Sequence, residues 1–267
     1  MCGAGEAVHP RTAKQDEGMK AALVVHRVTR DIEHNVCTML SAVQDAARAE
    51  AELILFAEMA STGFINGDDP ERDRAIAEPI PGPTTDRLAV SAREHGAWIG
   101  AGMFERDDPA LYDSAVLIDP TGRIRLTYRR MQPNWRTRDA DPDTYRLGDR
   151  VTAAETPFGR VAFLLCGDLF DDDTVDRLRA QQPDLLLFPF ARCFNDGAYD
   201  QRRWDEDELP EYLARVRRAG VRTLMANYIA DPELDGGSFG GAMDVAADGT
   251  LRSSLALGVV GALRVDL

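Results

Sequence analysis

A cysteine stands where an apolar strand should end, and its side chain can attack a carbonyl carbon. Cys166 closes the apolar run of residues 161–166 and is followed by Gly167, Asp168 and a helix-like stretch. A strand-to-helix turn lifts a side chain to the rim of a sheet, and a helix N-terminus favours the thiolate form. The pattern therefore predicts a nucleophile, although an interior cysteine of the core fits it as well.

A nucleophilic cysteine needs a base, and a glutamate is the better candidate for it here. Glu58 directly follows the apolar residues 53–57. Burial at a strand end raises the pKa of a carboxyl group toward the range useful for a general base. The pattern alone also fits an ordinary loop glutamate. The histidines all precede Cys166 and none sits in a strand-end motif like that of Cys166, which argues against a Cys–His protease: His9, His26, His34 and His95.

The elements that must position these side chains alternate between strand and helix patterns. Strands are expected at residues 21–26, 52–58, 97–104, 114–119, 123–128, 161–166, 184–190, 222–227, 242–246, 251–256 and 259–265, and helices at 32–49, 84–95, 173–180 and 209–219. Residues 129–150 are polar and predict a long loop. This order predicts one layered α/β domain with mixed sheets over residues 19–267, preceded by a loose extension over residues 1–18.

Five motifs in a fixed order resemble those of the nitrilase, or carbon–nitrogen hydrolase, superfamily. Residues 56–64 are similar to its glutamate motif, residues 128–133 to its lysine motif and residues 166–171 to its cysteine motif. Two further similarities are residues 226–227 and residues 239–243, which precede Asp248 and Gly249. Each motif is loose alone, but their order and spacing agree across residues 19–267.

The resemblance implies a fold, a mechanism and an assembly. The fold is an α/β four-layer αββα sandwich with two mixed sheets, and the chain forms a homodimer or higher homo-oligomer. No metal and no organic cofactor are implied. The implied catalytic residues are Glu58, Cys166 and, at the position of the family lysine, Arg130. The backbone N–H of Gly167 is implied as an oxyanion donor.

Several positions depart from the family pattern. Arg130 replaces the lysine, Gln132 replaces a histidine, and Gly167 replaces an aromatic residue. A second family glutamate falls near Asp141, which has a shorter side chain. A guanidinium still supplies charge and N–H donors, but it stays protonated and can pair with Glu58, which would depress the pKa of that carboxyl and weaken it as a base.

The replacement of the family lysine by Arg130 leaves two interpretations of the activity. In one, the chain is an amidase-like hydrolase that cleaves a non-peptide amide of a small molecule through a cysteine thioester. In the other, it is a diverged member that binds or scaffolds, or that transfers the acyl group to an amine. Candidate substrate-binding residues come from the loops after the strand ends: Trp135, Phe190, Arg192 and Asn195.

Composition indicates which partners and which cellular compartment to expect. Asp and Glu number 45 against 31 Lys and Arg, which gives a formal net charge of −14. A negative field of this size repels phosphate backbones and anionic lipid, so neither nucleic acid nor a membrane is expected as a partner. The 4 cysteines are scattered without paired spacing, which predicts free thiols and a cytoplasmic location.

Overall fold

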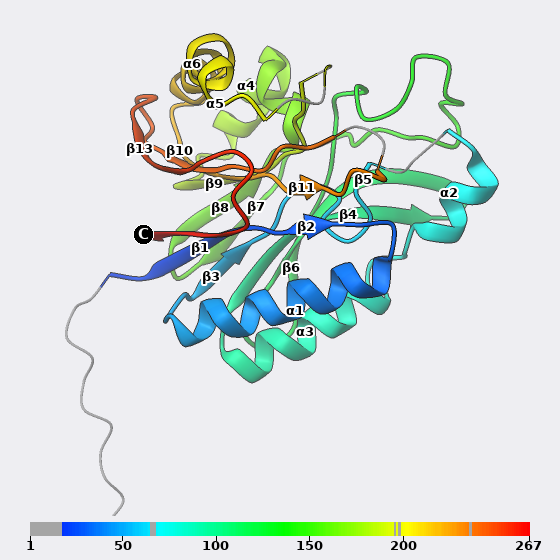
Figure 1. The fold of residues 1–267 in the computed structure, drawn as a ribbon, viewed down its shortest axis with the longest axis horizontal. Coiled ribbons are helices and arrows are strands. Elements are labelled where there is room, and N and C mark those ends of the chain that lie inside the picture. Colours follow the sequence, from blue (N-terminus) through cyan, green and yellow to red (C-terminus); the bar gives the residue numbers. More distant parts are fainter. Residues whose placement is uncertain (1–17, 65–67, 195, 197–198, 235–236) are drawn as a thin grey trace, which may run out of the picture.

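The computed structural model describes residues 18–64, 68–194, 196, 199–234 and 237–267 (Figure 1). Two six-stranded sheets pack face to face between two layers of helices (Figure 1). The predicted four-layer αββα sandwich is therefore confirmed. The extension predicted at residues 1–18 lies outside the described residues, apart from Gly18.

The first sheet consists of the strands that precede the long loop, together with the C-terminal strand. In sheet order its strands are β14 (Gly261–Asp266), β1 (Lys20–Val25), β3 (Leu53–Leu55), β4 (Trp98–Asp107), β5 (Ala110–Ile118) and β6 (Ile124–Arg129). Strands β1, β3 and β4 are parallel, and the remaining pairs are antiparallel. Helices α1 (Ile32–Arg48) and α3 (Pro83–His95) cover its outer face (Figure 1).

The second sheet repeats this plan. In sheet order its strands are β13 (Leu251–Leu255), β12 (Ala242–Val245), β10 (Arg222–Ala226), β9 (Leu185–Pro189), β8 (Gly159–Phe163) and β7 (Ala153–Thr156). Strands β8, β9 and β10 are parallel. Helices α4 (Asp172–Ala180) and α6 (Leu209–Ala219) lie on its outer face (Figure 1).

The core follows from the strand pattern, because residues that alternate along a strand point to opposite faces. Leu23 and Leu55 of the first sheet and Phe163 and Leu187 of the second belong to one fully buried cluster between the sheets. A second buried cluster lies beneath α1 and α3 and includes Met39. Both sheets are thus covered on both faces.

The sequence patterns missed several short elements. These are β2 (Arg27–Val28), β7 (Ala153–Thr156), β11 (Ile229–Ala230), α2 (Pro70–Ile76), α5 (Gln201–Arg203) and the π-helical segment η2 (Trp204–Glu208). The predicted strand of residues 161–166 is also wrong at its end. Strand β8 stops at Phe163, and Cys166 begins a 3-10 helix, η1 (Cys166–Phe170).

Candidate active site

Glu58 sits just beyond β3, held by the neighbouring strand β4. The N–H of Gly102 on β4 donates to the carbonyl of Ala57 at 3.0 Å, and the N–H of Ala60 donates back to Gly102 at 3.1 Å. A Cβ at position 102 would lie 2.4 Å from the Glu58 Cα, so only glycine allows this approach. The carboxyl group of Glu58 is consequently fixed and fully buried.

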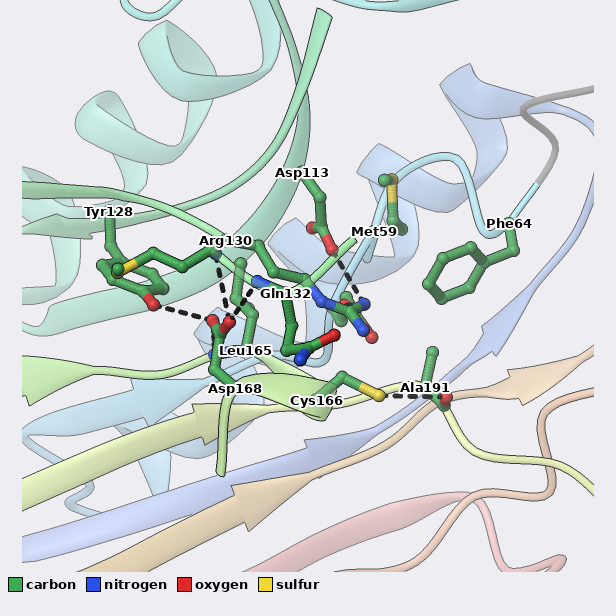
Figure 2. A network of polar contacts seen from close by, with 12 residues as sticks. Met59, Phe64, Asp113, Tyr128, Arg130, Gln132, Leu165, Cys166, Asp168 and Ala191 are labelled. Atoms are coloured by element: carbon green, nitrogen blue, oxygen red, sulfur yellow. Dashed lines mark hydrogen bonds and ion pairs between the residues drawn. The ribbon is translucent and has the colours of Figure 1, made fainter. Parts of the chain in front are cut away.

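Arg130 follows β6 directly, and β5 anchors its main chain. Its N–H donates to the carbonyl of Asp113 at 2.8 Å. Its side chain is 2% exposed, and Nη1 lies 2.8 Å from Glu58 Oε1 and 3.3 Å from Asp113 Oδ2. Figure 2 shows the guanidinium between Asp113 and Cys166. The fold therefore joins Glu58 and Arg130, which the sequence analysis singled out, and adds Asp113 to them.

Burial decides the protonation of this cluster. It raises the pKa of Glu58 to about 8, helped by the charge of Cys166 and opposed by Arg130. It also raises the pKa of Asp113 well above its usual value, and the charge of Glu58 adds to this. The ion pair with Arg130 exists, but it does not lower the pKa of Glu58 overall, because desolvation outweighs the guanidinium; the rise expected from burial at a strand end is therefore the effect that dominates. Near neutral pH the two carboxyl groups can share one proton, which suits a group that must both accept and donate one.

Replacing Arg130 by methionine should destabilise the fold strongly. The change leaves two buried carboxyl groups without their cation, and breaking a buried pair costs about 3–5 kcal/mol of unfolding free energy. Arg130→Lys keeps a cation and should lose less. The measurement is chemical denaturation, with Arg150→Met as control, because the Arg150–Asp149 pair is exposed on both sides and its loss should not move the midpoint. Equal midpoints for the Arg130→Met and Arg150→Met proteins would contradict this assignment.

Cys166 presents its sulfur to a cavity. Its φ of +42° is uncommon for a residue with a side chain and marks a sharp turn between β8 and η1. The thiol is partly exposed and lies 3.6 Å from the carbonyl oxygen of Ala191 (Figure 2). A cavity of about 590 Å³ is lined by Cys166 together with Arg130 and Gly167. The sulfur is thus accessible to a small molecule in this cavity, which Arg130 of the buried Arg130–Glu58 pair also lines.

Asp168 ties the cysteine turn to the segment that carries Arg130. One carboxylate oxygen accepts the hydroxyl of Tyr128 at 2.7 Å and the N–H of Leu165 at 3.1 Å. The other accepts the N–H groups of Met131 and Gln132, at 3.0 and 2.8 Å (Figure 2). This role could not be read from the sequence, since Tyr128, Met131 and Gln132 lie far from Asp168 along the chain.

We expect Asp168→Asn to loosen this connection. An amide has only one acceptor oxygen, so several buried donors lose their partner, and hydrogen bonds to a charged group are worth about 1.5–3 kcal/mol each. The unfolding free energy should fall by about 3 kcal/mol or more, against about 1.5 kcal/mol for Tyr128→Phe, which removes a single bond to the carboxylate. Thermal or urea unfolding checks this order, and a smaller loss for Asp168→Asn than for Tyr128→Phe would refute it.

Asp141, the possible second acid of the sequence prediction, does not lie in the buried cluster with Glu58. Its carboxylate is exposed and accepts hydrogen bonds from the Thr144 hydroxyl at 2.7 Å and the Asp143 N–H at 3.1 Å, which closes a surface turn. The acid beside Glu58 is Asp113. The hairpin offered a signal for it, because pairing Ser114 with Arg129 sets position 113 beside position 130.

The candidate substrate-binding residues separate into different places. Trp135 is buried against Phe104 and Tyr145, so it belongs to the core. Phe190 is also buried and stacks on Phe188. Arg192 does line the cavity, where its Nε donates to Glu208 at 2.7 Å. Asn195 lies outside the described residues.

The walls of the cavity combine aromatic and polar groups. Its lining includes Phe64, Phe170 and Tyr212 beside the polar Gln132 and Asn134. Across the described ranges, no group of three or more His, Cys, Asp or Glu side chains could hold a metal ion. None of the helices seen in these ranges has the length and hydropathy needed to cross a membrane.

Comparisons with known proteins place the chain in one family. A family model described as carbon–nitrogen hydrolase matches residues 20–257. The chain is 32% identical over 149 residues to a nitrilase from Pyrococcus abyssi, covering 55% of each chain. It is 25% identical over 185 residues to an omega-amidase from Xenopus tropicalis, covering 67% of this chain and 65% of that protein. The chain thus spans between about half and two thirds of the length of these relatives.

One solved structure extends the likeness to the whole fold. An amidase from Nesterenkonia sp. superposes with a TM-score of 0.77 at 21% identity, over 95% of this chain and 91% of that one. A sequence identity this low supports only a shared fold. It confirms the nitrilase-like arrangement expected from the five motifs.

Proposed function

Because the chain belongs to the carbon–nitrogen hydrolase family, we propose that it hydrolyses a non-peptide amide of a small molecule through a thioester on Cys166. The observation that carries this proposal is the cavity, where the accessible sulfur of Cys166 lies beside Arg130, itself bonded to the buried Glu58. Nucleophile, base and cation come from different strand ends, which is the arrangement that covalent catalysis needs.

In the first half of the reaction, Glu58 accepts the thiol proton and the sulfur attacks the amide carbon. The carbonyl oxygen gains negative charge, and the Gly167 N–H and the Arg130 guanidinium donate to it. The Gly167 N–H lies in the first turn of η1, where backbone amides have no partner within the helix. When the C–N bond breaks, Glu58 returns the proton to the departing amine or ammonia, and a thioester remains.

In the second half, water takes the place of the amine. Glu58, again ionised, accepts a proton from water, and the resulting hydroxide attacks the thioester carbon. The same two donors hold the oxyanion. The C–S bond breaks, the carboxylic acid leaves, and the proton returns to the sulfur. A pKa of about 8 for Glu58 suits both proton transfers near neutral pH.

The cavity favours amides with an uncharged acyl group. Arg192 is a candidate substrate-binding residue, and an arginine could bind a substrate carboxylate. However, Nε and Nη2 of Arg192 already donate to the carboxylate of Glu208. A carboxylate would have to displace Glu208, whereas the aromatic side chains of Phe64, Phe170 and Tyr212 accept an apolar group directly.

An amide panel tests the proposed function. We expect ammonia release from small neutral amides such as propionamide or benzamide, and slower release from succinamate. Iodoacetamide at limiting concentration should label Cys166 faster than Cys37 or Cys193. Labelling of Cys166 without any hydrolysis, but with transfer of the acyl group to hydroxylamine, would favour the acyl-transfer alternative. Slow labelling and no product would favour a member that only binds.

A further inference from the structure

A side chain at position 167 would collide with the guanidinium of Arg130 where it now lies. A Cβ built there would lie 2.6 Å from Arg130 Nη2, and 3.4 Å from the Cβ of Gln132. Contacts below 3.0 Å do not occur for real Cβ atoms. The φ of Gly167 is not in the left-handed region, so its backbone would accept any residue. The guanidinium is therefore the obstacle to a side chain at this position.

The arginine cannot simply move aside. Its side chain is 2% exposed, and Nη1 is held by Glu58 and Asp113. Its N–H is bonded to the carbonyl of Asp113, and Asp168 holds the amides of the two residues that follow it. A shift of Nη2 would have to break part of this network.

Nη2 is the part of the guanidinium left for the substrate. Within the described residues it forms no hydrogen bond, while Nη1 serves both carboxyl groups. Nη2 adjoins Gly167, and both residues line the cavity with Cys166. A donor at this place adjoins the Gly167 N–H, where the oxyanion would form.

We propose that Gly167 is a positioning residue coupled to Arg130, and that its missing side chain keeps Nη2 next to the nucleophile. The catalytic part of this inference rests on the proposed function. A guanidinium needs more room than an ammonium group. Arg130 and Gly167 thus form a matched pair. Arg130 stands where the related motifs have a lysine, and Gly167 stands where they have an aromatic residue.

A double-mutant cycle on Gly167→Ala and Arg130→Lys tests the coupling. In the parent, Gly167→Ala should lower kcat by about 10²–10³-fold with little change in KM, as expected when one oxyanion donor is displaced. In the Arg130→Lys background the same change should cost less than about threefold, so lysine rescues alanine. Equal losses in the two backgrounds, or no loss in the parent, would overturn the proposal.

Thermal unfolding of the same four proteins separates this inference from the proposed function. Gly167→Ala should lower the unfolding temperature with Arg130 present and leave it almost unchanged with lysine. This readout needs no substrate, so it decides the steric coupling even if the parent hydrolyses no amide. A Gly167→Ala protein that does not fold, whose Arg130→Lys double variant does, also supports the coupling. Failure of both to fold counts against it.

Discussion

Cys166→Ala should abolish amide hydrolysis, with a loss of at least about 10⁴-fold in kcat, because removing the nucleophile of a catalytic set leaves only binding and oxyanion stabilisation. The sulfur is the protein atom that bonds to the acyl carbon in the proposed reaction. The measurement is ammonia release from the best amide of the panel. Alanine is close in size to cysteine, so the fold should persist, and circular dichroism checks this.

Cys193→Ala provides the matched control. Cys193 is also partly exposed, and burial raises the pKa of its thiol, so it is a poor nucleophile at neutral pH. Its replacement should leave kcat within about twofold of the parent, as for most changes outside a catalytic set. If the two alanine variants lost activity equally, the assignment of Cys166 as nucleophile would be untenable.

Glu58→Gln has the second largest expected effect. Glutamine is nearly isosteric but cannot accept the thiol proton, and loss of a general base costs about 10²–10⁴-fold in rate. The parent should gain activity as pH rises through about 8, since Glu58 acts as a base only in its ionised form. The glutamine variant should lack this rise. Profiles of kcat/KM against pH for both proteins test the prediction.

Asp113→Asn separates the base from its neighbour. Asp113 contacts the same guanidinium atom, but burial raises the pKa of its carboxyl group well above the usual value, and asparagine resembles the protonated form that this favours. We expect a loss of about tenfold at most and a pH midpoint that stays near that of the parent. A larger loss for Asp113→Asn than for Glu58→Gln would make Asp113 the base instead.

Strand ends were the part of the site that the sequence could reveal. Cys166 and Glu58 each follow an apolar run, and the ends of buried strands are where a sheet exposes side chains. Arg130 came from the resemblance alone, since nothing in its local pattern marks it. Asp113 needed the hairpin register, and the sequence pattern had placed the start of that strand at residue 114, four residues after its actual start at Ala110.

The energetics of the site lay beyond the sequence for a different reason. The Glu58–Arg130 pair could be anticipated, but the direction of the pKa shift depends on whether burial or the cation dominates. Only the structure shows that both side chains are almost completely buried, which makes desolvation the larger effect. Asp168 is a similar case, because its role depends on residues 128–132 folding back over the cysteine turn.

The most direct test of the central claim is mass spectrometry of the protein quenched with acid during hydrolysis of a small amide. If Glu58, Arg130 and Cys166 act together in acyl transfer, the peptide that contains Cys166 should carry the mass of the acyl group, and the adduct should disappear when the amide is exhausted. Ammonia release with no adduct on Cys166, or with an adduct on another cysteine, would contradict the account.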